Sequence, residues 1–125
     1  MPVAKLKAPP ALGGLDFEVA GELERAKSRF VAANIDRCGY LRVAFKRDGA
    51  TNDLGIVVNF TLRPSRDWHR AEASIPKSAL ALGKGFDKKT AEAFSALAVS
   101  VGAVRIAQLF CPVPAADAVE MRELG

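Results

Sequence analysis

The chain has 125 residues, of which 50% are hydrophobic and 26% are charged, and its formal net charge is +4 at pH 7. This length suits one compact domain, and the high apolar fraction excludes a wholly disordered chain. The longest charge-free stretch, Ala93 to Val104, is shorter than the roughly 18 apolar residues of a membrane-spanning helix. We therefore expect no membrane partner, and a cytoplasmic protein, because the N-terminus lacks the apolar core of a secretory signal.

The first fourteen residues contain two features that interrupt helices, Pro9-Pro10 and Gly13-Gly14. Residues 1–14 are therefore predicted to form a flexible lead. Residues 15–125 are predicted to form a single domain.

Residues 15–35 carry apolar side chains at three- and four-residue spacings, beginning at Val19 and ending at Val31. This spacing predicts an amphipathic helix. Asp16 is a suitable N-cap for it, because a short acidic side chain accepts hydrogen bonds from the first free N–H groups.

Three later segments alternate apolar and polar residues, namely 40–47, 56–63 and 68–75. Alternation with a period of two predicts half-buried strands. The first two are joined by Asp48-Gly49 and further turn-forming residues, which predicts an antiparallel hairpin.

The remaining sequence predicts another long helix over residues 87–103, with Asp87 as its N-cap. Residues 104–110 are compatible with a strand or with more helix, and we favour a strand because Pro112 and Pro114 follow closely. The last ten residues before Gly125 predict a short helix.

This order predicts an α+β domain, with an antiparallel sheet of three to four strands, two main helices on one face and a short C-terminal helix. The order α-β-β-β-α, with Lys84, Lys88 and Lys89 near the start of the last helix, is similar in topology alone to the double-stranded-RNA-binding domain. It departs from that family in the longer segment between the third strand and the helix.

The polar faces of the predicted strands suggest a binding surface. Residues 38–90 hold ten Lys or Arg against five Asp or Glu, a local charge of +5. Arginine binds phosphate, and exposed aromatic rings stack on bases. The stacking candidates are Tyr40 and Trp68. The phosphate-binding candidates are Arg42, Lys46, Arg47, Arg63, Arg66, Arg70, Lys84, Lys88 and Lys89. The alternative is an ordinary solvated face, because exposed strands also carry cations that deter aggregation.

Enzymatic chemistry and metal binding find little support in the sequence. The single histidine, His69, has no nucleophile and acid at a spacing typical of catalysis. Cys38 and Cys111 form no metal-ligand pattern. We therefore expect no catalytic residue, no metal and no cofactor, although a role for His69 stays open.

The hypothesis is a small non-enzymatic protein that contacts DNA or RNA, single-stranded or structured, through a basic sheet face and a lysine-rich helix start. The alternative is a protein-interaction or inhibitor module, of the kind that mobile elements or phages encode, which docks on an acidic protein surface. A homodimer is a further possibility, because the helix over residues 91–104 offers small side chains for close packing.

Overall fold

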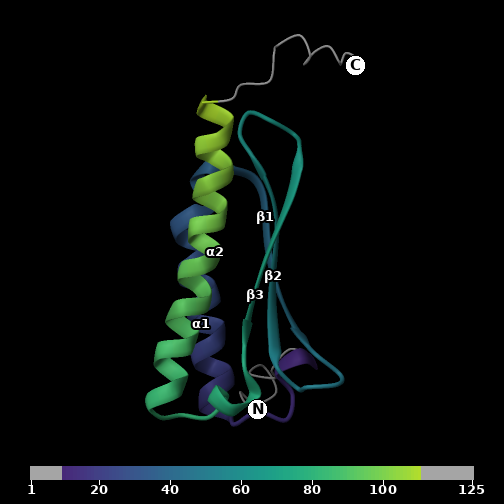
Figure 1. The fold of residues 1–125 in the computed structure, drawn as a ribbon, viewed down its shortest axis with the longest axis vertical. Coiled ribbons are helices and arrows are strands. Elements are labelled where there is room, and N and C mark those ends of the chain that lie inside the picture. The colour runs from purple at the N-terminus through teal and green to yellow at the C-terminus, as the bar shows by residue number, and fades with distance from the viewer. Residues whose placement is uncertain (1–9, 111–125) are drawn as a thin grey trace, which may run out of the picture.

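The structure is a computed structural model that describes residues 10–110, and it has two layers (Figure 1). One layer holds helices α1 and α2, and the other is a three-stranded sheet. The helices and strands are α1 (Phe17–Asn34), β1 (Cys38–Arg47), β2 (Leu54–Leu62), β3 (Trp68–Ile75) and α2 (Lys84–Phe110). Within residues 10–110, three single turns of 3-10 helix accompany them, at Pro10–Leu12, Ile35–Arg37 and Lys77–Ala79.

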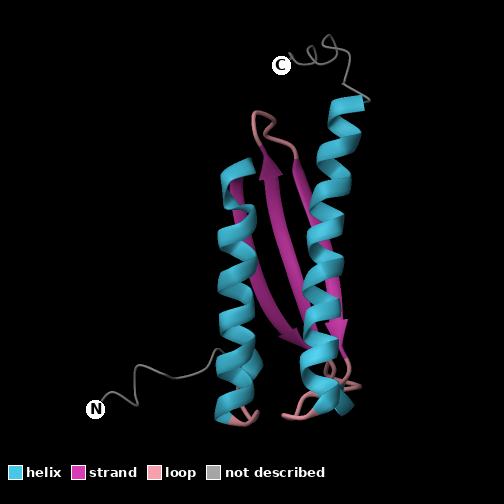
Figure 2. Ribbon diagram, turned by 90° about the vertical axis from the view of Figure 1, so that its left-hand side faces the viewer, coloured by secondary structure: helices cyan, strands magenta, loops and turns pink. Residues whose placement is uncertain are grey.

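The sheet is antiparallel throughout and has the order β1-β2-β3. Its register places Val58 of the central strand between Val43 and Ala71. Both helices lie across the same face of the sheet (Figure 2), with α1 against β1 and α2 against β3. The α+β prediction, with two helices packed on one face of an antiparallel sheet, is confirmed.

Helix α1 begins as its sequence predicts. The Asp16 carboxylate accepts a hydrogen bond from the Glu18 backbone N–H at 2.8 Å, which satisfies one of the free donors of the first turn. Val19, Leu23 and Phe30 are buried along one stripe of the helix. The Phe30 ring meets Phe94 of α2, with 5.9 Å between ring centroids, and so links the two helices.

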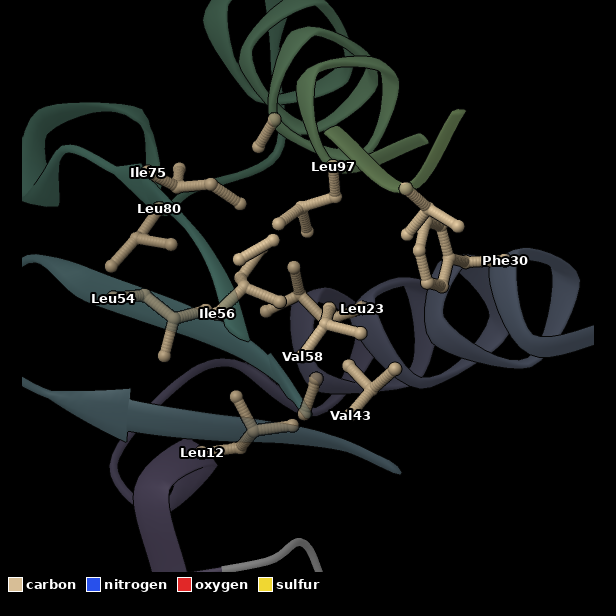
Figure 3. Close-up of a cluster of buried hydrophobic side chains, with 14 of the residues drawn as sticks. Leu12, Leu23, Phe30, Val43, Leu54, Ile56, Val58, Ile75, Leu80 and Leu97 are labelled. Atoms are coloured by element: carbon tan, nitrogen blue, oxygen red, sulfur yellow. The ribbon is translucent and has the colours of Figure 1, made fainter. Parts of the chain in front are cut away.

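The core lies between the helix layer and the sheet (Figure 3). Its centre is formed by Leu23 of α1, Ile56 and Val58 of β2, and Leu97 of α2, all of which are fully buried. Central strand β2 contributes a buried residue at every second position from Leu54 to Phe60. Burying these side chains stabilises the fold by roughly 1.5–3 kcal/mol each.

Helix α2 differs from its prediction at both ends. It begins at Lys84, so Asp87 lies in its first turn and is not its N-cap. It also continues through Gly102, and residues 104–110 are helical, so the predicted strand there is wrong. The helix continues because Val104 extends the stripe of Leu97 and Val101 and packs against the core. The predicted short C-terminal helix lies outside the described residues.

Over Lys84–Gln108, α2 is long and apolar enough to cross a membrane, judged by length and composition alone. Here Phe86, Ala93, Leu97 and Val101 are buried in the core. Only 22% of the apolar stretch of α2 is buried in the structure, so core packing accounts for a small part of its apolar character.

Part of the predicted lead belongs to the core. Pro10–Leu12 form a turn of 3-10 helix that lies against β1, and the Leu12 side chain is fully buried. The sequence did not predict this contact, because a single leucine among Pro and Gly residues shows no periodicity.

We expect Leu12→Ala to lower the free energy of unfolding by about 2–5 kcal/mol, because it leaves a cavity in the core. Leu82→Ala is the matched control, since Leu82 is 49% exposed. Chemical denaturation of both variants measures the difference. Equal stabilities for the two variants would show that the contact of Leu12 contributes nothing.

Candidate nucleic-acid interface

The face of the sheet that points away from the helices is called here the outer face (Figure 1). The strand register arranges its side chains in rows across the three strands. From the β2–β3 end to the β1–β2 end, the rows are Tyr40–Thr61–Trp68, Arg42–Asn59–Arg70, Ala44–Val57–Glu72 and Lys46–Gly55–Ser74. Residues that are scattered in sequence therefore share one surface.

The first row holds an exposed aromatic pair. The rings of Tyr40 and Trp68 meet edge to face, with 4.9 Å between centroids and 69° between planes. Their side chains stay 43% and 62% exposed. Thr61 lies buried between them on the central strand. Strand β1 can approach β2 closely here because position 39 is glycine, where a Cβ would stand 2.9 Å from the Thr61 hydroxyl.

The second row places an amide between two guanidinium groups. Arg42 and Arg70 are exposed on the edge strands, and Asn59 lies between them. The Arg70 Nε donates to Glu72 at 2.7 Å, and both side chains are exposed. Solvent-exposed pairs of this kind contribute little stability, so a phosphate can compete for Arg70. Arg42 has no ion pair within residues 10–110.

The last row borders an open hollow of about 430 Å³ at the β1–β2 end of the outer face. Gly55 lacks a side chain between Lys46 and Ser74, and this gap leaves room for the hollow. Arg70 and Glu72 also line it, together with Asp48 and Asp53 beside the turn.

The acidic groups of the β1–β2 turn are held by hydrogen bonds from backbone N–H groups. The Asp48 carboxylate accepts hydrogen bonds from the backbone N–H groups of Thr51 and Ala50, and these bonds lower the pKa of Asp48. The Asp53 carboxylate accepts from the backbone N–H of Lys77 at 2.8 Å. Arg47 is also engaged, since its Nε donates to the Asn52 carbonyl at 3.1 Å.

Two of the predicted cations lie near the aromatic pair but outside the rows. Arg63 follows β2, and its Nε donates to the Cys38 carbonyl at 2.8 Å, so this side chain ties the two strands together. Arg66 is exposed in the connection between β2 and β3.

The three lysines at the start of α2 do not join the outer face. Lys84, Lys88 and Lys89 lie in the helix layer, on the other side of the sheet (Figure 1). Lys89 also pairs with Glu92 at 3.4 Å. The eleven candidates therefore do not form one surface, and the outer face combines Tyr40, Arg42, Lys46, Trp68 and Arg70.

Two features of this face were absent from the predicted site. Asn59 was not among the predicted binding residues, although the alternation of residues 56–63 puts it on the polar side. The hollow was not predicted from the sequence, although one indication was present. Gly55 lies one residue before the alternating segment, on the same side of the strand as Val57 and Asn59. The width of the gap depends on Lys46 and Ser74, whose pairing with Gly55 only the register shows.

The outer surface of α2 is where a dimer was predicted. Its small residues Ala91, Ser95 and Ala98 border a second open groove of about 430 Å³, between α1 and α2. Val99 and Ile106 are exposed apolar side chains on the same helix. A dimer through this surface stays a prediction.

The thiol of Cys38 and the imidazole of His69 lie in different surroundings. Cys38 is buried, and burial raises the pKa of its thiol, which disfavours the reactive thiolate. His69 lies on the core side of β3 with its ring against Phe60, and its Nε2 has no hydrogen-bond partner in the described part of the chain. Within residues 10–110, no three His, Cys, Asp or Glu side chains group as metal ligands. Cys111 lies outside the described residues.

Comparisons of the chain with protein-family models, with curated proteins and with solved structures found no match.

We expect Asp48→Ala to lower the melting temperature at neutral pH, because it removes the acceptor that closes the turn. The pKa of Asp48 is lowered in the folded state, so this stabilisation is complete above its ordinary pKa and is lost as the pH falls through the folded value. The gap between the wild-type and variant melting temperatures should therefore narrow in acid. Asp67→Ala, in the other strand connection, is the control. A gap that is constant across the pH series would contradict this account.

Proposed function

We propose that the protein is a non-enzymatic nucleic-acid-binding domain that uses the outer face of its sheet. The observation that carries this proposal is the exposed Tyr40–Trp68 pair, which lies one row from Arg42 and Arg70. Aromatic rings beside guanidinium groups, on a sheet face that no described helix covers, form a general solution for binding bases and phosphates together.

The first contribution to binding would be electrostatic attraction between cationic side chains and phosphates. Arg42, Lys46 and Arg70 would neutralise phosphates and release the counterions condensed around them, which makes the affinity depend on salt. An exposed base would then stack on Trp68 or Tyr40. The Asn59 amide can donate to or accept from a base edge, since it presents both kinds of group.

The exposure of the Tyr40 and Trp68 rings favours a binding surface over an ordinary solvated sheet face. A solvated strand face needs only polar or charged side chains. Large aromatic rings left in water are typical of interaction sites, where partner contacts bury them. The two rings also support each other edge to face, so little side-chain freedom remains to be lost when a base stacks on them.

The test is the binding of labelled single- and double-stranded oligonucleotides, followed by fluorescence anisotropy across a salt series. We expect Trp68→Ala to weaken binding by about 1–3 kcal/mol, because one stacked base is lost. Trp68→Phe should retain most of the affinity. Arg42→Ala should reduce the slope of log K against log salt by about 1.

Two charge controls locate the surface. Arg29→Ala removes an exposed cation from α1, and Lys88→Ala removes one from the start of α2. Neither should change affinity as much as Arg42→Ala. No binding at low salt, or a salt slope near zero, would reject the proposal. A partner from lysate that is retained after nuclease treatment would favour docking on an acidic protein.

A further inference from the structure

The two ends of the outer face differ in kind. The aromatic pair occupies one end, and the hollow over Gly55 occupies the other. Tyr40 and Lys46 mark these ends on β1, and the six residue steps of strand from one to the other span roughly 20 Å. This length suits two or three bases laid along a sheet.

The floor between the two ends is low. Ala44 and Val57, which make up most of the third row, are too short to block a chain that crosses it, and Val57 already lines the hollow. Arg42 and Lys46 lie four residues apart on β1 and point to the same side of the strand, beside this path. Cations therefore accompany the path from one end to the other.

The hollow itself is close to electrically neutral. Lys46, Arg47 and Arg70 line it together with Asp48, Asp53 and Glu72. Such a balance does not favour a phosphate inside the hollow, so the phosphates are expected along the path beside it. The hollow suits a group that is polar but uncharged, with both donors and acceptors, and a nucleobase with its sugar is such a group.

We infer that the ligand of the outer face is a single strand that lies along the sheet and is held at both ends. This inference rests on the proposed function. One base stacks on the Tyr40–Trp68 pair, the phosphates that follow meet Arg42 and Lys46, and a nucleoside further along enters the hollow over Gly55. A duplex cannot bind in this way, because its paired bases offer no free ring to Trp68 and none to the hollow.

The experiment measures affinity for oligouridylates and oligothymidylates of increasing length, from two nucleotides to about ten, with blunt duplexes as a separate arm. Affinity should rise steeply until the strand spans both ends of the face, at about three nucleotides, and then level off. Trp68 is the only tryptophan of the chain, so its own fluorescence reports stacking. It should change with single strands and not with duplexes.

Ser74→Leu fills the hollow from the exposed side of β3 without touching the aromatic pair. We expect it to lower the affinity for the longer oligonucleotides at least about fivefold, because one base can no longer enter the hollow. The shortest oligonucleotides should be unaffected. Ser95→Leu, the same change on the outer surface of α2, is the matched control, and the melting temperature of each variant verifies folding.

The outcomes separate the two proposals. If no oligonucleotide binds at low salt, the proposed function fails and this inference fails with it. If oligonucleotides bind but duplexes bind equally well, or if Ser74→Leu has the same effect at every length or none, the proposed function stands and the two-ended single-strand mode is overturned.

Discussion

The structure depends on the pairing of β2 with a neighbour on each side. Val58 lies between Val43 and Ala71, and the side chains of β2 alternate between the core and the outer face. A slip of one residue in either pairing would turn the apolar set of that strand toward water. The burial of Ile56, Val58 and Phe60 therefore fixes, at the same time, which side chains stand on the outer face and opposite which neighbours.

This constraint turns a weak sequence pattern into a defined surface. Tyr40 and Trp68 are 28 positions apart in the sequence, yet their rings meet because both residues pair with Thr61. Arg42 and Arg70 stand on either side of Asn59 for the same reason. The helices take no part in this surface, because they cover the opposite face (Figure 2).

Charge alone was a poor guide to the surface. The basic middle of the chain was predicted to act as a unit, but its cations divide between two layers. The lysines at the start of α2 belong to the helix layer, whereas Arg42 is exposed on the outer face, and Arg63 binds the Cys38 carbonyl. A count of charges along a chain contains no information about which side of a sheet each charge occupies. The rows of the sheet supply that information.

The sequence by itself determined the three strands, their inner and outer positions and the first helix, because these follow from the local period of apolar residues. Tertiary structure decided the segments in which apolar residues show no regular spacing, or a spacing compatible with both helix and strand. Residues 104–110 continue α2 because Val104 finds the core, and Leu12 joins the core from a segment that has no pattern. The hollow over Gly55 also belongs to this second class, because it is bounded by side chains from β1 and β3 that only strand pairing brings together.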